Sequence, residues 1–137
     1  MPTTLNPGGF LKLPTDYKSL LFYKKTVVLY DMTTYFVSHY LERGDRTIDQ
    51  MVQAARSGKQ NIAEGLEDGM TSTEMAIKLL NVARSSLKEL LEDYEDQLRS
   101  HQLTLWTAEH PRAEALKQYC YAHHESADYT PYFDRWN

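Results

Sequence analysis

The sequence predicts an all-α protein, an antiparallel up-down four-helix bundle with three clear long helices and a weak fourth. Three observations lead to this fold class. Apolar residues recur at steps of three and four over three long stretches, which is the period of an amphipathic helix. The 6 Gly and 5 Pro residues cluster near the chain ends and at a few interior points. Helix start and stop signals separate the three stretches from one another.

The chain of 137 residues has the length of one domain and can bury a real core. We divide it into three parts. Residues 1–14 are an N-terminal arm, because Pro and Gly interrupt any regular element there. Residues 15–125 form the helix-bundle domain. Residues 126–137 form an aromatic C-terminal tail, whose rings must cover this bundle, a partner or sequence that this chain does not contain.

Composition narrows the classes of function. The net charge of −4 and the isoelectric point near 5.7 argue against a protein that binds nucleic acid over its whole surface. The single cysteine, Cys120, cannot form an internal disulfide, and a cytoplasmic location fits it best. No apolar run is long enough to span a membrane, and residues 1–10 lack the pattern of a secretory signal. We therefore expect no membrane partner.

The first predicted helix covers residues 16–43. Pro14 precedes it, Thr15 or Asp16 can cap its free backbone N–H groups, and Gly44 ends it. Two adjacent apolar rows make a stripe wide enough to face two neighbouring helices. The rows are Leu20, Tyr23, Val27, Tyr30, Thr34, Val37 and Leu41, and Tyr17, Leu21, Val28, Met32 and Phe36.

The second predicted helix begins after Asp45, which can cap it, and can end at Gly65 or Gly69. Gly58 stands in its apolar row, where a large side chain would be expected. Glycine inside a helix costs about 1 kcal/mol relative to alanine, so its presence needs a reason. Small residues surround it, which indicates close approach of the backbone of a neighbouring helix. We call residues 54–65 the seam.

The third predicted helix has the clearest period in the chain and lasts to about His101. Thr71 and Glu74 form a capping box at its start. Its apolar row continues over a helix on the order of 40 Å long. The row is Ala76, Leu80, Ala83, Leu87, Leu90, Tyr94 and Leu98.

The fourth helix is only weakly predicted. Its start signal is Pro111, which can occupy the first helical position. Leu116, Tyr119 and Cys120 give it a narrow apolar face. We expect either this short helix or sequence beyond Asn137 to complete the bundle.

Two polar residues of the seam, Asn61 and Glu64, are the first candidates for a site. They are three residues apart on a helix, so they share a face and can reach one ligand or each other. One interpretation is a polar site in a subunit interface. The other, which we favour, is a buried hydrogen-bonded pair that fixes helix register, with Glu64 meeting a basic residue such as Arg84. Gly58 and Gly65 complete this structural motif.

Four basic residues, Arg43, Arg46, Arg56 and Lys59, are candidates for contacts with nucleic-acid phosphates. Acidic residues are interleaved with them, which favours an ordinary solvated surface. Residues 64–96 carry nine acidic residues against three basic ones. Such a surface can receive a basic partner or line a ring channel, but it is more often solvated helix surface.

The sequence predicts no catalytic, cofactor-binding or metal site. Cys120, His123 and His124 lie close together, but structural zinc needs four ligands and no second pair stands at a suitable spacing. Cys120 has no neighbouring turn of the kind that presents a nucleophile. The chain also lacks a glycine-rich phosphate loop and the paired Glu-x-x-His motifs of metal-binding bundles. We therefore expect no enzyme activity and no cofactor.

Motifs in the second and third helices resemble those of a known family. They are Asn61-Ile62-Ala63-Glu64-Gly65, then Thr71-x-x-Glu74-Met75, then Val82-Ala83-Arg84-Ser85-Ser86-Leu87-Lys88-Glu89-Leu90. Over about residues 46–98 the chain is similar to the four-helix-bundle proteins encoded in 23S rRNA intervening sequences. It departs from them before Asn61, where Arg56-Ser57-Gly58-Lys59-Gln60 replaces the common apolar residue and proline.

The resemblance implies an antiparallel four-helix bundle that assembles into a ring, most often a pentamer. In a related branch, the accessory proteins of diversity-generating retroelements, a basic pentameric barrel binds a reverse transcriptase and nucleic acid; this chain is acidic instead. We expect a non-catalytic, cytoplasmic scaffold or accessory protein that assembles with itself. One alternative is an accessory factor that binds RNA or DNA beside a reverse transcriptase or rRNA. A metal-binding bundle is the other.

Overall fold

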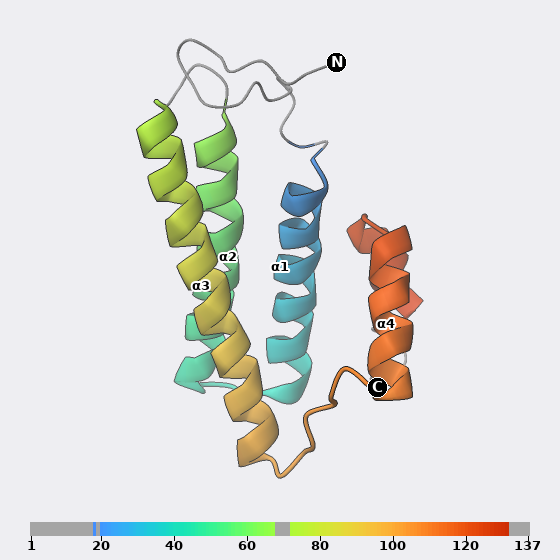
Figure 1. The fold of residues 1–137 in the computed structure, drawn as a ribbon. Coiled ribbons are helices and arrows are strands. Elements are labelled where there is room, and N and C mark those ends of the chain that lie inside the picture. Colours follow the sequence, from blue (N-terminus) through green and yellow to red (C-terminus); the bar gives the residue numbers. More distant parts are fainter. Residues whose placement is uncertain (1–17, 19, 68–71, 132–137) are drawn as a thin grey trace.

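The computed structural model describes residues 18, 20–67 and 72–131 (Figure 1). Its helices are α1 (Leu21–Tyr40), α2 (Arg46–Leu66), α3 (Thr73–Ser100) and α4 (Pro111–Ala122), followed by the 3-10 turn η2 (Ser126–Tyr129). These described residues contain no strand, so the prediction of an all-α bundle is confirmed. Within the same ranges, no helix is both long enough and apolar enough to cross a membrane.

Two clusters of buried side chains hold α1, α2 and α3 together. The first joins the end of α1 to the start of α2 and the second half of α3, through Val37, Met51, Ala54, Ala55 and Leu90. The second joins the end of α2 to the first half of α3, through Ile62, Leu66 and Ala83; residues from the start of α1 pack against it. α1 and α2, and α2 and α3, therefore lie side by side (Figure 1).

Helix α1 is shorter than predicted, because it begins at Leu21 and ends at Tyr40. The predicted caps, Thr15 and Asp16, lie outside the described residues. Gly44 follows in the turn to α2 with a φ of +92°, a conformation that glycine adopts without steric cost. The turn therefore favours this glycine, but α1 already ends at Tyr40, so the prediction that Gly44 ends the helix is wrong.

The buried face of α1 includes two threonines that neither predicted apolar row contains. Thr26 and Thr33 are 5% and 0% exposed. The Thr26 hydroxyl donates a hydrogen bond to the carbonyl of Tyr23 at 2.6 Å. Thr33 Oγ1 lies 2.8 Å from the hydroxyl of Tyr94 on α3. These hydrogen bonds satisfy both polar groups, which allows them to be buried at small net cost.

Helix α2 begins as predicted and ends later. The Asp45 carboxylate accepts a hydrogen bond from the backbone N–H of Thr47 at 2.9 Å, which confirms the predicted cap. The helix continues through Gly65 to Leu66, so the prediction that Gly65 offers an exit is wrong. The other predicted exit, Gly69, lies outside the described residues.

Helix α3 has 28 residues and carries the predicted row, with Ala83 and Leu90 as its buried members. The cap differs from the prediction by one residue. Ser72 Oγ accepts a hydrogen bond from the backbone N–H of Met75 at 3.2 Å. Thr71, the predicted cap, lies outside the described residues. Ser72 and Met75 have the spacing of a cap and its third helical residue, so Glu74 is not the reciprocal partner.

Helix α4 forms where Pro111 predicted it, and Pro111 occupies its first turn. The imidazole Nδ1 of His110 accepts a hydrogen bond from the backbone N–H of Arg112 at 3.1 Å and caps the helix. No residue of α4 is buried, and the helix stands apart from α2 and α3 (Figure 1). Of the aromatic tail, Tyr129 is 1% exposed; Tyr132, Phe133 and Trp136 lie outside the described residues.

Candidate functional site

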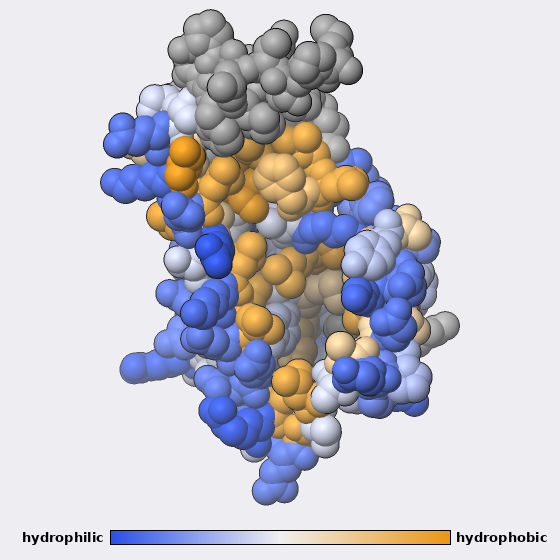
Figure 2. Space-filling view, in the orientation of Figure 1, coloured by the Kyte–Doolittle hydropathy of each residue, from blue (hydrophilic) through white to orange (hydrophobic). Residues whose placement is uncertain are grey.

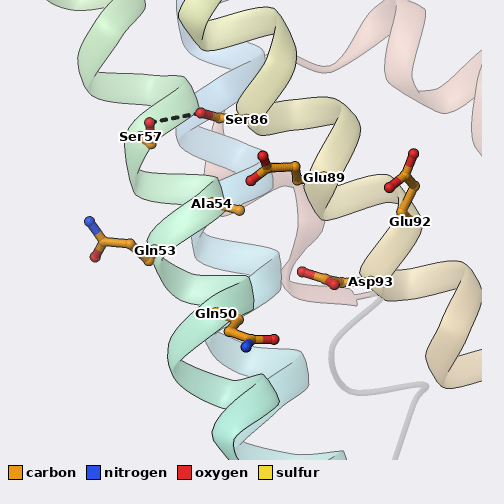
Figure 3. Close-up of a pocket in the computed structure, with 8 residues that line it drawn as sticks. All are labelled: Gln50, Gln53, Ala54, Ser57, Ser86, Glu89, Glu92 and Asp93. Carbon is orange, nitrogen blue, oxygen red and sulfur yellow. Dashed lines mark hydrogen bonds between the residues drawn. The ribbon is translucent and has the colours of Figure 1, made fainter.

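A polar groove lies between α2 and α3, beside the seam. Its volume is about 540 Å³. The residues that line it come from the first half of α2 and the middle of α3: Gln50, Gln53, Ala54, Ser57, Ser86, Glu89, Glu92 and Asp93. Figure 3 shows Glu89 and Asp93 projecting from α3 toward α2, while Gln53 and Glu92 point outward.

A chain of hydrogen bonds connects the two walls of this groove. Ser57 Oγ on α2 lies 2.8 Å from Ser86 Oγ on α3 (Figure 3). The side-chain amide of Asn61 donates to the carbonyl of Ser57 at 2.8 Å and to Ser57 Oγ at 3.1 Å. The predicted role of Asn61 as a structural hydrogen-bonding residue is therefore supported, but its partner is Ser57, one helical turn earlier, rather than Glu64.

Glu64 and Arg84 do not form the buried pair that we favoured. Both side chains are exposed to solvent. The ion pairs that the described residues form are Lys24–Glu125 and Arg99–Asp96, and neither includes Glu64 or Arg84. The next residue, Gly65, faces Ala76 and Leu79 on α3, and a step of about 100° along the helix turns the side chain of Glu64 away from them. The prediction of a buried Glu64 is wrong for this reason.

The two glycines of the motif give α3 room to pack against α2. A Cβ on Gly58 would lie 2.5 Å from Leu87 Cδ2 and 2.8 Å from Leu87 Cγ, so a leucine side chain fills the space. A Cβ on Gly65 would lie 3.3 Å from the backbone carbonyl oxygen of Ala76. Close approach of a helix backbone was predicted at Gly58; the structure shows it at Gly65.

The four basic residues do not form one patch. Arg43 and Arg46 are exposed in the turn before α2 and at its start. Arg56 is exposed farther along α2. Lys59 is half-buried, and its ammonium group lies 4.9 Å from the centre of the Tyr30 ring on α1, within cation–π distance. Three arginines therefore remain accessible, whereas the lysine contributes to packing between α1 and α2.

Carboxylates concentrate at the lower end of the groove, around Asp93. Partial burial raises the pKa of the Asp93 carboxyl above its usual range, and the negative charges of Asp96, Glu89 and Glu92 raise it further. The groove therefore offers hydrogen-bond acceptors and negative charge. Its serines hydrogen-bond to each other and to Asn61, with no imidazole among the lining residues to act as a base. This arrangement suits recognition of a polar or cationic group.

Removing the charge of Asp93 is expected to stabilise the fold at neutral pH. A raised pKa means that the folded state binds this proton more tightly, so stability is lost as pH rises through the folded value. We expect Asp93→Asn to raise the free energy of unfolding at about pH 7 by up to roughly 0.5 kcal/mol, the scale of exposed charge interactions. At about pH 3, where both states are protonated, the gain should vanish. Urea unfolding at the two pH values measures this.

Glu95→Gln serves as the control, because it removes a charge from an exposed position that does not line the groove. Equal changes for the two variants at neutral pH would contradict a specific effect at Asp93.

Within the Cys120–His124 cluster, Cys120 and His123 make contacts with α1 and within α4. The backbone carbonyls of Cys120 and His123 both accept hydrogen bonds from Lys25 on α1, the second at 2.7 Å. The His123 ring stacks on Tyr119 with centroids 3.7 Å apart, and its Nδ1 hydrogen-bonds the Tyr119 carbonyl at 2.9 Å. Across residues 18, 20–67 and 72–131, no three or more His, Cys, Asp and Glu side chains lie together as a group that could hold a metal ion.

Part of the groove could not be found from the sequence. Ser57 and Ser86 are 29 residues apart, and only the packing of α2 on α3 brings their hydroxyls together. No pattern in the sequence indicated Gln50 as a groove residue. A search for polar residues on the inner face of both predicted helices would have found Ser57, Ser86 and Asp93, because each lies close to an apolar row.

Comparisons of the chain with models of known families, with curated proteins and with solved structures find no match. The resemblance to the proteins of 23S rRNA intervening sequences therefore depends on the motif residues of α2 and α3 alone.

Proposed function

We propose that this protein is a non-catalytic helix-bundle scaffold or accessory subunit that assembles with itself into a ring. The resemblance of its central motifs to the intervening-sequence proteins supports a ring and favours a pentamer. The observation that carries the proposal is an apolar surface at one end of the bundle, which a monomer would leave in water.

This surface, the end patch, consists of exposed side chains from the starts of α1 and α3: Leu21, Phe22, Met75, Ile77 and Val82. Their exposed fractions lie between 43% and 54%. The two helix starts are neighbours, because Tyr23 on α1 and Leu80 on α3 pack against the same buried cluster. Figure 2 shows apolar residues gathered at this end of the bundle. Exposed apolar side chains gathered at one end of a bundle are candidates for protein contacts.

Assembly is tested by measuring mass in solution. We expect the protein at micromolar concentration to have a multiple of the 15.9 kDa chain mass by mass photometry or sedimentation. Val82→Glu should shift the population to smaller species, because a buried unpaired charge is costly in an interface. Asn81→Glu is the matched control: it places the same charge on the neighbouring exposed position and should leave the mass unchanged.

A purely monomeric wild-type protein would overturn the proposal of self-assembly. An assembled wild type whose mass is insensitive to Val82→Glu would show that the end patch is not the interface.

The accessibility of Arg43, Arg46 and Arg56 supports a second candidate, an accessory factor that binds RNA or DNA. It predicts affinity for structured RNA that falls steeply with salt, as phosphate contacts require. Arg56→Ala should weaken binding, whereas Lys88→Ala removes an exposed charge on a different helix, α3, and should not. Absence of any mobility shift at low salt would reject this candidate.

A further inference from the structure

A second groove, which is apolar, lies between the end of α3 and α4. Its volume is about 820 Å³. Nine residues from α3, the connection and α4 line it: Leu98, Leu103, Thr104, Leu105, Trp106, Ala113, Leu116, Lys117 and Cys120. In Figure 2 a hollow lined by apolar residues separates the α3 side of the molecule from the α4 side.

Helix α4 is attached to the bundle at its two ends. At its start, residues 101–110 connect it to α3. At its other end, the ammonium group of Lys25 donates to the carbonyls of Cys120 and His123, a favourable place for a cation because helix C-termini carry partial negative charge. Lys24 forms an ion pair with Glu125 at 2.6 Å. α4 is therefore held at its ends, while its middle faces the groove.

The turn η2 strengthens the attachment at the second end. Tyr129 is 1% exposed, and its hydroxyl donates to the carbonyl of His123 at 2.8 Å. The turn η2 contacts α1. At this junction, His124 Nδ1 and Ser126 Oγ are buried without a hydrogen-bond partner, although buried polar groups normally have one.

Both walls of the groove carry a row of apolar side chains. On α4, Ala113, Leu116 and Cys120 are spaced by three and four, so they form one apolar row. On α3, Leu91 and Leu98 are seven residues apart and share a face. Leu91 is 56% exposed and does not line the groove as the structure stands. An apolar row on α4 thus stands opposite an uncovered apolar row on α3.

The connection between the two helices also carries exposed apolar side chains. Leu103, Leu105 and Trp106 are 61%, 59% and 45% exposed. Gln102, directly before them, has a φ of +58°, which places a sharp change of chain direction after α3. Movement of α4 toward α3 about this point would cover the same side chains that the groove exposes.

We propose that α4 is an arm, hinged at residues 101–110, that closes onto α3 by releasing the contacts of its other end with Lys24 and Lys25, and that the structure shows it open. The occupant of the groove is α4 itself, because its own apolar row forms one wall. The chain reverses through residues 101–110, so in the closed position Leu98 lies near Ala113 and Leu91 near Cys120. Closure removes the groove from the surface.

Cys120 provides a direct test, because it is the only cysteine in the chain. In Leu91→Cys, closure brings two thiols together, and diamide oxidises them to a disulfide when their Cα atoms come within about 7 Å. We expect an intramolecular disulfide, seen as loss of both free thiols and faster migration of the monomer in a non-reducing gel. With Trp136 replaced by Phe, oxidation should also make the fluorescence of Trp106 less quenchable than in the reduced variant.

Glu89→Cys is the matched control, because this position is exposed and projects toward α2 (Figure 3). It should keep both thiols. Retention of both thiols in Leu91→Cys, or equal oxidation of the two variants, would overturn the proposal. Disulfide-linked dimers of Leu91→Cys in place of the intramolecular product would overturn it as well, since a second copy would then occupy the groove.

Discussion

Replacing Leu90 with alanine is expected to lower the free energy of unfolding by about 2–5 kcal/mol, the range for removing a large buried side chain. Leu90 is 1% exposed and belongs to the buried cluster that joins α3 to Val37 on α1 and Met51 on α2. Its removal leaves a cavity among three helices that cannot all move inward together. Urea unfolding at fixed protein concentration measures the change, because any self-assembly makes stability depend on concentration.

Lys88→Ala is the control for this measurement. Lys88 is exposed on the same helix, two residues before Leu90, and its side chain has a similar number of carbons. We expect a change within about 0.5 kcal/mol. Similar losses for the two variants would mean that the inner face of α3 is not the one the structure shows.

Gly58→Val is expected to destabilise the packing of the seam against α3. A Cβ at this position would lie 2.5 Å from Cδ2 of Leu87, well inside van der Waals contact, and valine adds two further methyl groups. Overpacking of this kind costs about 1–3 kcal/mol, and here it outweighs the gain in helix propensity from removing a glycine. The change is measured as a shift in the urea midpoint.

A double-mutant cycle with Leu87→Ala shows whether the contact is the cause. The double variant should be more stable than the sum of the two single changes predicts, by about 0.5–3 kcal/mol. Gln53→Val, at an exposed position of α2, should be nearly neutral. If the two changes simply add, Leu87 does not limit the size of residue 58.

The helices themselves were largely predictable, because they depend on local sequence. The period of the apolar rows found α2 and α3. Asp45 marked a helix start because its side chain can accept a hydrogen bond from a free backbone N–H, and Pro111 because proline suits the first helical position. The start of α3 was misplaced by one residue because Thr71 and Ser72 are chemically equivalent as caps.

The candidate site was only partly predictable. From its small residues, the seam was predicted to pack closely against a neighbouring helix, and the structure shows that this helix is α3. The role of Glu64 was wrong, because spacing along one helix does not show which of two neighbouring positions faces the partner. Thr26 and Thr33 were missed because a polar side chain enters a core only when a hydrogen-bond partner exists there, and the partner of Thr33 is Tyr94 on another helix.

The sequence by itself determined the all-α class, the number of long helices and the residues of the seam. Each of these follows from interactions within a few residues, such as apolar periodicity, capping and the cost of glycine in a helix. The tertiary structure alone decided that Ser57 meets Ser86, that Glu64 faces solvent and that α4 stands away from α3. Such contacts join residues far apart in the chain, and they depend on how whole helices pack against one another.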